Sequence, residues 1–453
     1  MQKLTDKEKL IQILQLPKGA TIEDTLEHDH LTEYVIRHPE PSERVCPHCG
    51  CTDCVKKDSR LQTVRHIPVT RKGTLISFHR RRYRCKQCHA SFNEPVYWIY
   101  EGAHISSALY ISICMELQST KSIRQIALDL AVSEAVVRGV LEAIPFGPAP
   151  YLPETLCIDE FGGHTGIWDP EKKRWITEDF HCIIADGNPH NRVILDILPK
   201  PNKDFLVRYF KTCFTEQDRQ RVKYFCCDFR PGFRSTAAEC FKNAHICLDT
   251  FHVVKQQTDR IRKLHNSVKK RLLAEEPDKE KKKCITKTFY KAQHLLTARR
   301  NAPFGYWFND PEKKQERLDK ILALDEELSE AYQALQQFYD IIHSDSYAHQ
   351  RFFLSEWIST YFLSVYEGMK KIANLYKWNK TYILNTFKYG KSNSACEGLN
   401  ANIKLMKKNG YGAHKFITFR KRLLFAFGSI RFVQETYTIF AERKATARKG
   451  EAL

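Results

Sequence analysis

The chain of 453 residues lacks any long hydrophobic run and is comparatively poor in acidic side chains. No apolar stretch approaches the roughly 20 residues that a helix needs to cross a bilayer. The opening residues MQKLTDKEKLIQILQLP lack the apolar core and small-residue cleavage site of a secretory signal. Asp and Glu number 53 against 72 Lys and Arg, which gives a net charge of +19 with His neutral. We therefore expect a cytoplasmic protein that binds nucleic acid rather than a membrane surface.

Cysteine is plentiful, with 16 in the chain, and six of these fall between Cys46 and Cys88. Disulfide scaffolds are small and secreted, so reduced thiols with a metal-bound cluster are the better interpretation. Two CxxC pairs, in CPHCG and RCKQCHASF, flank two segments with the pattern of strands, LQTVRHIPV and LISFHRRRYRC. This arrangement is typical of a zinc ribbon with four thiolate ligands. The predicted ligands are Cys46, Cys49, Cys85 and Cys88.

The choice of zinc ligands is complicated by a second CxxC pair. Cys51 and Cys54 lie just downstream of the first pair, and His48 and His89 are also close in the sequence. We favour the other two pairs because they flank the predicted hairpin, one on each side. Whether Cys51 and Cys54 also bind zinc stays open.

Basic residues next to the second CxxC pair form a candidate DNA-binding face. Strand alternation places Arg80, Arg82 and Arg84 on one side, where they could contact phosphates. The alternative is an ordinary solvated basic strand. Further along, SIRQIALDLAVSEAVVRGVLEAI has two apolar helical faces around a short turn, and Ser133 is a candidate cap of the second helix. We expect a helix-turn-helix with Arg138 facing DNA, although any antiparallel helix pair has a similar pattern.

The middle of the chain has an α/β pattern. Strand-like segments are ETLCIDE, FHCIIADG, RVILDILP, RVKYFCCDF and AHICLD, with helical segments between the later ones. This order predicts a mixed sheet in which the first and fourth strands lie side by side. Asp159 and Asp228 end these two strands and would then come together. Paired carboxylates repel unless cations lie between them, and Mg²⁺ prefers oxygen ligands.

Each of these assignments has an alternative. Glu160 is adjacent to Asp159, and either could be the ligand, although we favour Asp159 from its place in CIDEF. Asp228 could cap a helix that starts near Pro231. Asp249 and His252 in LDTFHVVK also follow a strand, and they either have a structural role or line the site.

A third carboxylate lies far downstream in SACEGLNANIKLMKKNGYG. At roughly 100° per residue, one helical face carries a set of polar residues. That set is Glu397, Asn400, Lys404 and Lys408. The apolar side chains fall on the opposite face, which we expect to pack on the sheet edge. Glu397 would then complete a metal site, and the amide and lysines would face DNA; the alternative is a solvated surface acid.

The motifs CPHCG, RRYRCKQCHASF, DEFGGH, CCDFRPGF, LDTFHVVK and SNSACEGLNANIKLMKKNGYG occur together and in this order. In this set the chain resembles the ISL-three family of bacterial insertion-sequence transposases over nearly its whole length. The resemblance implies a DDE-type enzyme with an RNase H-like core, whose three catalytic acids match Asp159, Asp228 and Glu397. It further implies two Mg²⁺ ions (or Mn²⁺), structural Zn²⁺, and a dimer or higher assembly on DNA.

The expected layout follows from these patterns and the resemblance. It comprises a helical leader (1–45), a zinc-binding ribbon (46–100), a helix-turn-helix (101–148), the first part of an RNase H-like core (151–254), a helical insertion (255–385) and the last part of the core with basic helices (386–453). The expected function is cleavage of double-stranded DNA at terminal inverted repeats and strand transfer into target DNA, on the nucleoid of a bacterium. The alternatives are an inactive DNA-binding regulator and an RNase H-like nuclease without strand transfer.

Overall fold

The computed structural model consists of two compact units, which we describe separately. The N-terminal unit comprises residues 1–147 and 401–453, and the core unit comprises residues 148–400. The structure describes residues 5–41, 43–69, 72–100, 104–163, 167–171, 174–176, 180–190, 192–290, 292–300, 311–409 and 416–428. Within these ranges no helix combines the length and apolar character needed to cross a membrane.

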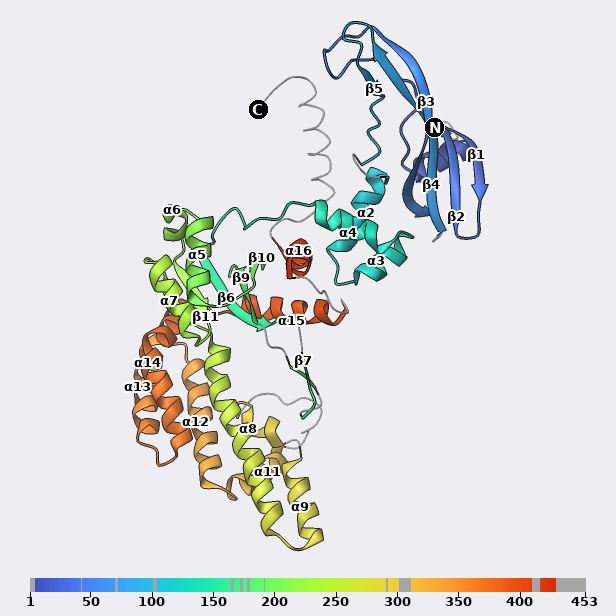
Figure 1. The fold of residues 1–453 in the computed structure, drawn as a ribbon. Coiled ribbons are helices and arrows are strands. Elements are labelled where there is room, and N and C mark those ends of the chain that lie inside the picture. Colours follow the sequence, from blue (N-terminus) through green and yellow to red (C-terminus); the bar gives the residue numbers. More distant parts are fainter. Residues whose placement is uncertain are drawn as a thin grey trace. The chain divides into compact units, whose positions relative to one another are not determined.

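The N-terminal unit begins with a short helix and a sheet (Figure 1). Its elements are α1 (Asp6–Ile13), β1 (Thr21–Glu27), β2 (Leu31–Arg37), β3 (Cys54–Val69), β4 (Lys72–Cys85) and β5 (Ser91–Asn93). The strand order is β1-β2-β4-β3, with β5 on β4, and β3 and β4 form the long antiparallel hairpin expected of the ribbon. The prediction of a helical leader over 1–45 is wrong beyond α1. In LTEYVIR every second residue is buried, which is the two-residue period of a strand.

Three helices follow the sheet. They are α2 (Ser107–Leu117), α3 (Ile123–Asp129) and α4 (Glu134–Ala143). The turn between α3 and α4 contains Ala131 in the left-handed region, with φ of 50°. The apolar faces of all three helices meet in one core, so the expected helix pair is present within a three-helix bundle. Ser133 precedes α4 at the N-cap, but its side chain makes no capping hydrogen bond.

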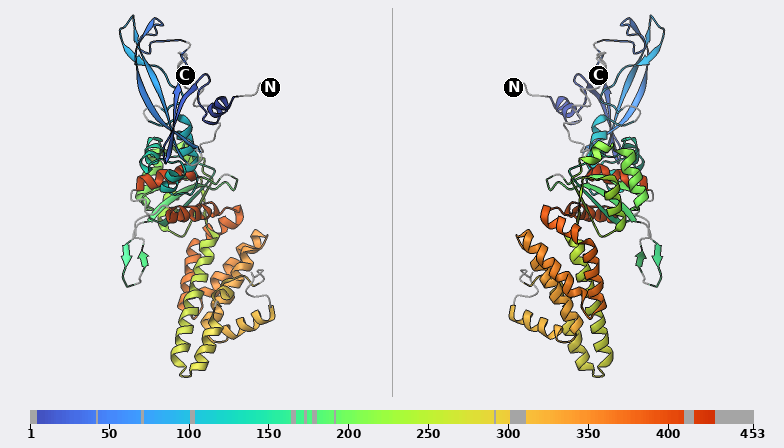
Figure 2. Two further views of the ribbon diagram at one scale, coloured as in Figure 1. Left: turned by 90° about the vertical axis from the view of Figure 1, so that its right-hand side faces the viewer. Right: turned by 90° about the vertical axis from the view of Figure 1, so that its left-hand side faces the viewer.

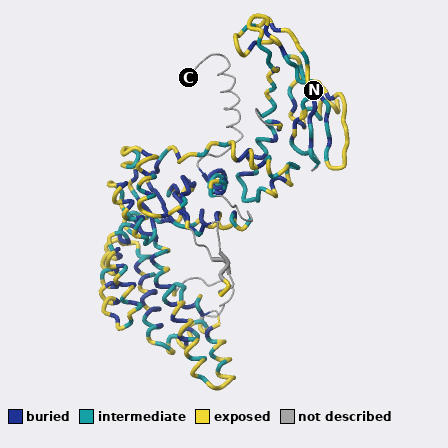
Figure 3. The backbone as a smooth tube through the Cα atoms, viewed as in Figure 1, coloured by how far each residue is buried: buried dark blue, intermediate teal, exposed yellow. Residues whose placement is uncertain are grey.

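The core unit contains a sheet with the order β10-β9-β6-β11-β12. Its strands are β6 (Thr155–Gly162), β9 (Phe180–Asp186), β10 (Ile194–Leu198), β11 (Tyr224–Cys227) and β12 (His245–Leu248). Strand β6 pairs in parallel with β11 and antiparallel with β9. The first and fourth strands are therefore neighbours, as expected for an RNase H-like core. Figure 3 shows buried residues gathered along these strands, and every residue of β10 is buried.

Helices flank the core sheet and then form a long insertion. Beside the sheet lie α5 (Lys203–Cys213), α6 (Glu216–Gln220) and α7 (Pro231–Cys240), and a small hairpin of β7 (Ile167–Asp169) and β8 (Arg174–Ile176) follows β6. The insertion contains α8 (Thr250–Glu275), α9 (Lys279–Phe289), α10 (Ala292–Thr297), α11 (Pro311–Leu322), α12 (Glu326–Ile342), α13 (Tyr347–Phe362) and α14 (Glu367–Tyr389). Figure 2 shows these helices extending from the sheet as a bundle. One continuous hydrophobic cluster joins the sheet to this bundle.

Two helices complete the described chain. Helix α15 (Ser394–Asn409) starts in the core unit and continues into the N-terminal unit, and α16 (Phe416–Phe427) belongs to the N-terminal unit. Phe425 of α16 is part of the same hydrophobic core as α2, α3 and α4. The predicted boundary for the last core segment was 386, whereas the division into compact units falls between Asn400 and Ala401.

Candidate active site and zinc centre

Three aspartates lie at matching positions on adjacent parallel strands of the core sheet. Cys157 of β6 pairs with Cys226 of β11, which pairs in turn with Cys247 of β12. Two residues beyond each of these cysteines come Asp159, Asp228 and Asp249. Asp159 and Asp249 are buried, with 4% and 3% of their surface exposed. The sheet therefore brings together the two predicted aspartates and a third one.

The three aspartates share a local hydrogen-bonding pattern. Oδ1 of Asp159 accepts from the Glu160 N–H at 2.8 Å, and Oδ1 of Asp228 accepts from the Arg230 N–H at 2.8 Å. In the same way, Oδ1 of Asp249 accepts from the Phe251 N–H at 3.2 Å. Each carboxyl group is thus fixed by an amide one or two residues further along the chain.

Glu397 reaches the aspartates from the first turn of α15. The chain returns from the insertion along β12, where the Thr386 hydroxyl donates to the Leu248 carbonyl at 2.6 Å. Just before α15, the buried Asn393 side chain donates to the Ile158 carbonyl at 3.1 Å. These bonds attach the start of α15 to the strand that carries Asp159. The predicted third acid therefore lies in the same cluster as the aspartates.

The electrostatics of the site confirm that these carboxyl groups are close. Burial, reinforced by the charges of Asp228, Glu160 and Glu397, raises the pKa of Asp159 to about 7. Burial and the neighbouring Glu397 likewise raise the pKa of Asp249 to about 7. Burial and like charges both disfavour ionised carboxylates. A cation among these groups would remove that repulsion, so their chemistry fits a divalent metal site.

The spacing of the acids differs from that of a preformed metal cage. Among the residues that the structure describes, only the cysteine tetrad considered below brings three or more ligand atoms within 4.8 Å of one another. In the described part of the chain, no three carboxylate oxygens of the acid cluster meet this distance.

Glu160 and Asp159 have different partners, which bears on the choice between them. Glu160 forms an ion pair with Arg230. Oδ2 of Asp159 instead accepts a hydrogen bond from the Asn400 side chain at 2.8 Å. The geometry favours Asp159 as the residue that faces the other acids, while Arg230 compensates the charge of Glu160.

His252 lies one helical turn after Asp249, and its Nε2 is 4.0 Å from Asp249 Oδ2. Burial lowers the pKa of His252, so its ring is neutral at physiological pH. A distance of 4.0 Å is too long for a hydrogen bond. His252 therefore lies beside the acid cluster but does not donate a hydrogen bond to Asp249.

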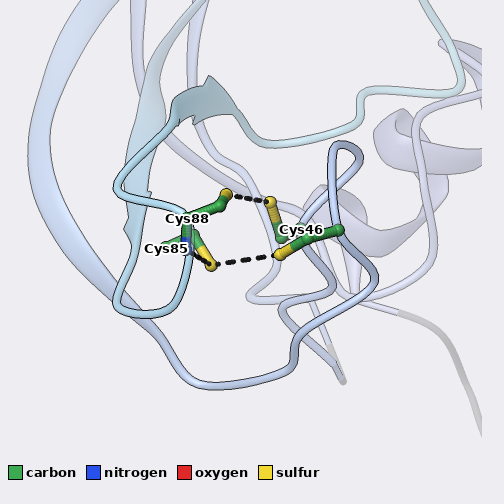
Figure 4. A group of neighbouring side chains, drawn as sticks. Cys46, Cys85 and Cys88 are labelled. Atoms are coloured by element: carbon green, nitrogen blue, oxygen red, sulfur yellow. Dashed lines mark hydrogen bonds between the residues drawn. The ribbon is translucent and has the colours of Figure 1, made fainter.

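The four predicted zinc ligands converge in the N-terminal unit. The sulfurs of Cys46 and Cys88 are 3.6 Å apart, as are those of Cys49 and Cys85 (Figure 4). Tetrahedral zinc with bonds of about 2.3 Å places its sulfurs about 3.8 Å apart. The backbone N–H of Cys88 lowers the pKa of the Cys85 thiol to about 6, which favours the thiolate that zinc binds. The residues thus fit a structural zinc ion.

Cys51 and Cys54 lie outside this tetrad. Cys54 is buried in a small cluster with Cys46, Tyr83 and Cys85, and its thiol donates to the Cys51 carbonyl. Burial raises the pKa of Cys54 to about 11. The four sulfurs that converge within 4.8 Å of one another do not include that of Cys54, so the structure assigns Cys54 to packing beneath the metal centre.

The predicted DNA-binding residues have varied surroundings. Arg80 donates hydrogen bonds to the Glu94 carbonyl and the Gln62 side chain. Nη1 of Arg82 lies 3.8 Å from Oδ2 of Asp58. Arg84 is exposed. On α4, the exposed Arg138 forms an i,i+4 ion pair with Glu134 at 3.1 Å. Of these arginines, Arg84 and Arg138 are the most accessible to a phosphate backbone.

Helix α15 agrees only in part with the predicted DNA-facing surface. Its apolar side chains Leu399, Ile403 and Met406 are buried, as the helical period predicts. Lys404 and Lys408 are exposed. Asn400 differs, because it is buried and its amide is used by Asp159. The periodicity placed Asn400 correctly beside Glu397, but the partner on β6 could not be identified from local sequence. Sequence reasoning also missed the Glu160–Arg230 pair and Asn393, for the same reason.

A mixed sheet with this strand order, and with acids at matching positions of its neighbouring parallel strands, has the RNase H-like arrangement. Residues 156–423, more than half of the chain, match the family model for transposases of the ISL3 DDE type. Residues 42–88 match the zinc finger of the transposases of IS204, IS1001, IS1096 and IS1165. The chain belongs to this ISL3 transposase family. It is therefore a DNA transposase, an enzyme that binds and cleaves DNA and carries out strand transfer.

Individual relatives are distant. The transposase for insertion sequence element IS1001 of Bordetella parapertussis is 21% identical over 378 residues, which cover 83% of this chain and 86% of that protein. A solved Drosophila P element transposase strand transfer complex is 12% identical, covers 71% of this chain and 90% of that chain, and has a TM-score of 0.35.

Proposed function

We propose that Asp159, Asp228 and Glu397 are the catalytic acids of this transposase and hold two Mg²⁺ ions, or Mn²⁺ in their place. The observation that carries this proposal is geometric: β6 and β11 are paired in parallel with Asp159 and Asp228 at matching positions, and the helix of Glu397 is hydrogen-bonded to Asp159 through Asn400. When bound, two such ions polarise the phosphate, lower the pKa of the attacking water or hydroxyl, and stabilise the leaving oxygen.

The protein's own part in the reaction is to orient these acids before DNA arrives. The Glu160 and Arg230 amides hold Asp159 and Asp228 in fixed rotamers, and Asn400 anchors Asp159 from α15. Because Asn400 and Glu397 are on the same helix, one contact sets the position of both. Asp159 must release its proton before it can act as a ligand.

Cleavage at the element ends would expose 3′-hydroxyls, which the same site would then direct at phosphates of the target DNA. The acids act as ligands throughout, so no covalent bond between protein and DNA is required. Glu160, which is neutralised by Arg230, takes no part as a ligand in this scheme.

DNA recognition would be divided among several elements. We propose that α3 and α4 form a helix-turn-helix, with Arg138 on the second helix, and that the exposed Arg84, Lys404 and Lys408 contact phosphates. The substrates would be terminal inverted repeats and target DNA on a bacterial nucleoid. Synapsis of two element ends requires at least a homodimer on DNA.

The triad is tested with Asp159→Asn, Asp228→Asn and Glu397→Gln proteins on oligonucleotides that carry the element ends. Each variant should bind the ends like the unsubstituted protein and yet give no cleavage product. Asp204→Asn changes an exposed acid of the same unit and should cleave normally. Full cleavage by the Asp228→Asn protein would refute the assignment.

A joining assay with pre-cleaved ends separates a transposase from a nuclease on the same fold. The unsubstituted protein should join the 3′-hydroxyl ends to a target plasmid in the presence of Mg²⁺. Cleavage without joining would favour a nuclease. End binding with neither reaction would favour a regulator.

A further inference from the structure

We propose that Asp249 is a fourth carboxylate ligand of the active-site metal, positioned to bind a divalent cation together with Glu397. This inference rests on the metal site proposed above and adds a ligand to it. Asp249 directly follows β12, as Asp228 directly follows β11, and Asp159 lies at the matching level within β6. The register of these three adjacent parallel strands points to one shared site.

The hydrogen bonds of Asp249 leave one oxygen without a donor. Its Oδ1 accepts from the Phe251 N–H, whereas its buried Oδ2 has no hydrogen-bond partner among the described residues. Oε1 of Glu397 is buried and without a partner in the same part of the structure. Glu397 lies close enough to Asp249 to raise its pKa, so the two carboxyl groups are neighbours. A buried oxygen normally has a partner, and a cation between the two groups would serve both.

The charges of the cluster also fit this proposal. Asp159, Asp228, Asp249 and Glu397 together carry four negative charges when ionised. Two divalent cations carry four positive charges, so the four acids would balance them before DNA binds. The charged groups that act most strongly on Asp159 and Asp249 are other acids, and Arg230 is paired with Glu160.

Asp249 also has a structural role, because it is the N-cap of α8. Asn and Ser are good N-cap residues, so Asp249→Asn and Asp249→Ser remove the charge and keep the cap. Capping of α8 uses only Oδ1 of Asp249, so this structural role does not involve Oδ2. The two roles can therefore be separated by substitution.

The position of Asp249 in the chain gives the proposed ligand a further consequence. The helical insertion leaves the core directly after Asp249, and the chain returns from it shortly before Glu397. A metal bound by both residues would join the two ends of the insertion across the active site.

The test is calorimetric titration of the full, zinc-loaded chain with Mn²⁺. Asp249→Asn should lose one binding event or bind Mn²⁺ roughly tenfold or more weakly, while its circular dichroism spectrum in buffer without divalent metal stays that of the folded protein. Asp278→Asn changes the equivalent N-cap of α9, away from the acids, and should bind Mn²⁺ normally. Should the Asn variant fail to fold, Asp249→Ser gives the same comparison.

The outcomes distinguish this inference from the proposed triad. If Asp249→Asn binds Mn²⁺ with unchanged stoichiometry and affinity while Asp228→Asn does not, the fourth ligand is refuted and the triad stands. If Asp159→Asn, Asp228→Asn and Glu397→Gln all bind Mn²⁺ like the unsubstituted protein, the metal site itself is refuted, and this inference with it.

Discussion

At the scale of single residues, the active site depends on small neighbours of the acids as much as on the acids. Asn400 donates to Asp159, and main-chain amides fix all three aspartates. Partners of this kind, just outside the ligands, typically change metal affinity by a factor of about 10–100 when they are lost. Asn400 is therefore a positioning residue for Asp159.

Asn400→Ala should weaken Mn²⁺ binding by roughly tenfold, because a buried carboxylate oxygen loses its donor. Calorimetry with Mn²⁺ measures this effect. Asn402→Ala, on the exposed side of the same helix, is the matched control. Equal affinities for the Asn400 and Asn402 variants would contradict this role.

The pKa of Asp159 also predicts a pH dependence of stability. Its folded value of about 7 lies above its ordinary value of 3.8, so between these values the folded chain keeps a proton that the unfolded chain has lost. Stability without divalent metal should therefore fall as the pH rises through this window. Asp159→Asn removes this contribution, and its melting temperature relative to the unsubstituted protein should be higher at about pH 8 than at about pH 5. The same difference at both pH values would contradict the prediction.

At the scale of elements, the hairpin of β3 and β4 depends on the zinc centre at its end. The apolar cluster there is small, with Cys46, Cys54, Tyr83 and Cys85 at its centre. Such a cluster buries too little apolar surface to order two CxxC loops, so metal binding must contribute.

Cys85→Ser should abolish zinc binding and reduce binding to element ends, because three thiolates leave the tetrahedral site incomplete. Native mass spectrometry gives the number of zinc ions per chain. Cys51→Ser, outside the tetrad, should keep its zinc. Loss of zinc from the Cys51 variant would show that the second CxxC pair takes part in binding.

At the scale of the whole molecule, the N-terminal unit is built from both ends of the described chain. Phe425 of α16 is buried in the core of α2, α3 and α4. Its ring packs edge-on against that of Phe146, with 5.9 Å between the ring centroids. The buried Arg422 donates to the carbonyls of Ser119 and Lys121 at 2.8 Å and 3.0 Å. The bundle of α2, α3 and α4 is therefore completed by a helix that follows Glu397 in sequence.

A fragment of residues 1–147 should consequently be less stable than the same unit in the full chain, because the apolar surface of α2, α3 and α4 that α16 covers would be exposed to water. A peptide of residues 416–428 should bind this fragment and raise its melting temperature. The same peptide with Arg422→Ala should bind more weakly, since the Ser119 and Lys121 carbonyls lose a charged donor. A fragment that melts independently of either peptide would contradict this account.

The sequence by itself determined the elements whose signals are local. CxxC spacing identified the zinc ligands, strand-like segments identified the hairpin of the ribbon and the strands of the core, and helical periods identified the insertion and the buried face of α15. The order of strands and helices also indicated that Asp159 and Asp228 would be neighbours. Prediction from sequence failed for residues 21–37, where the strand pattern is short and follows a helix.

Only the tertiary structure decided which side chains meet across long stretches of the chain. The positions of Glu397 and Asn400 beside Asp159 depend on hydrogen bonds between the returning chain and the sheet. Other contacts likewise join distant segments. Glu160 pairs with Arg230, the strand register adds Asp249, and α16 packs against α2, α3 and α4. Local residue patterns specify periods and caps, whereas such contacts arise only when the packed core fixes the distances between elements.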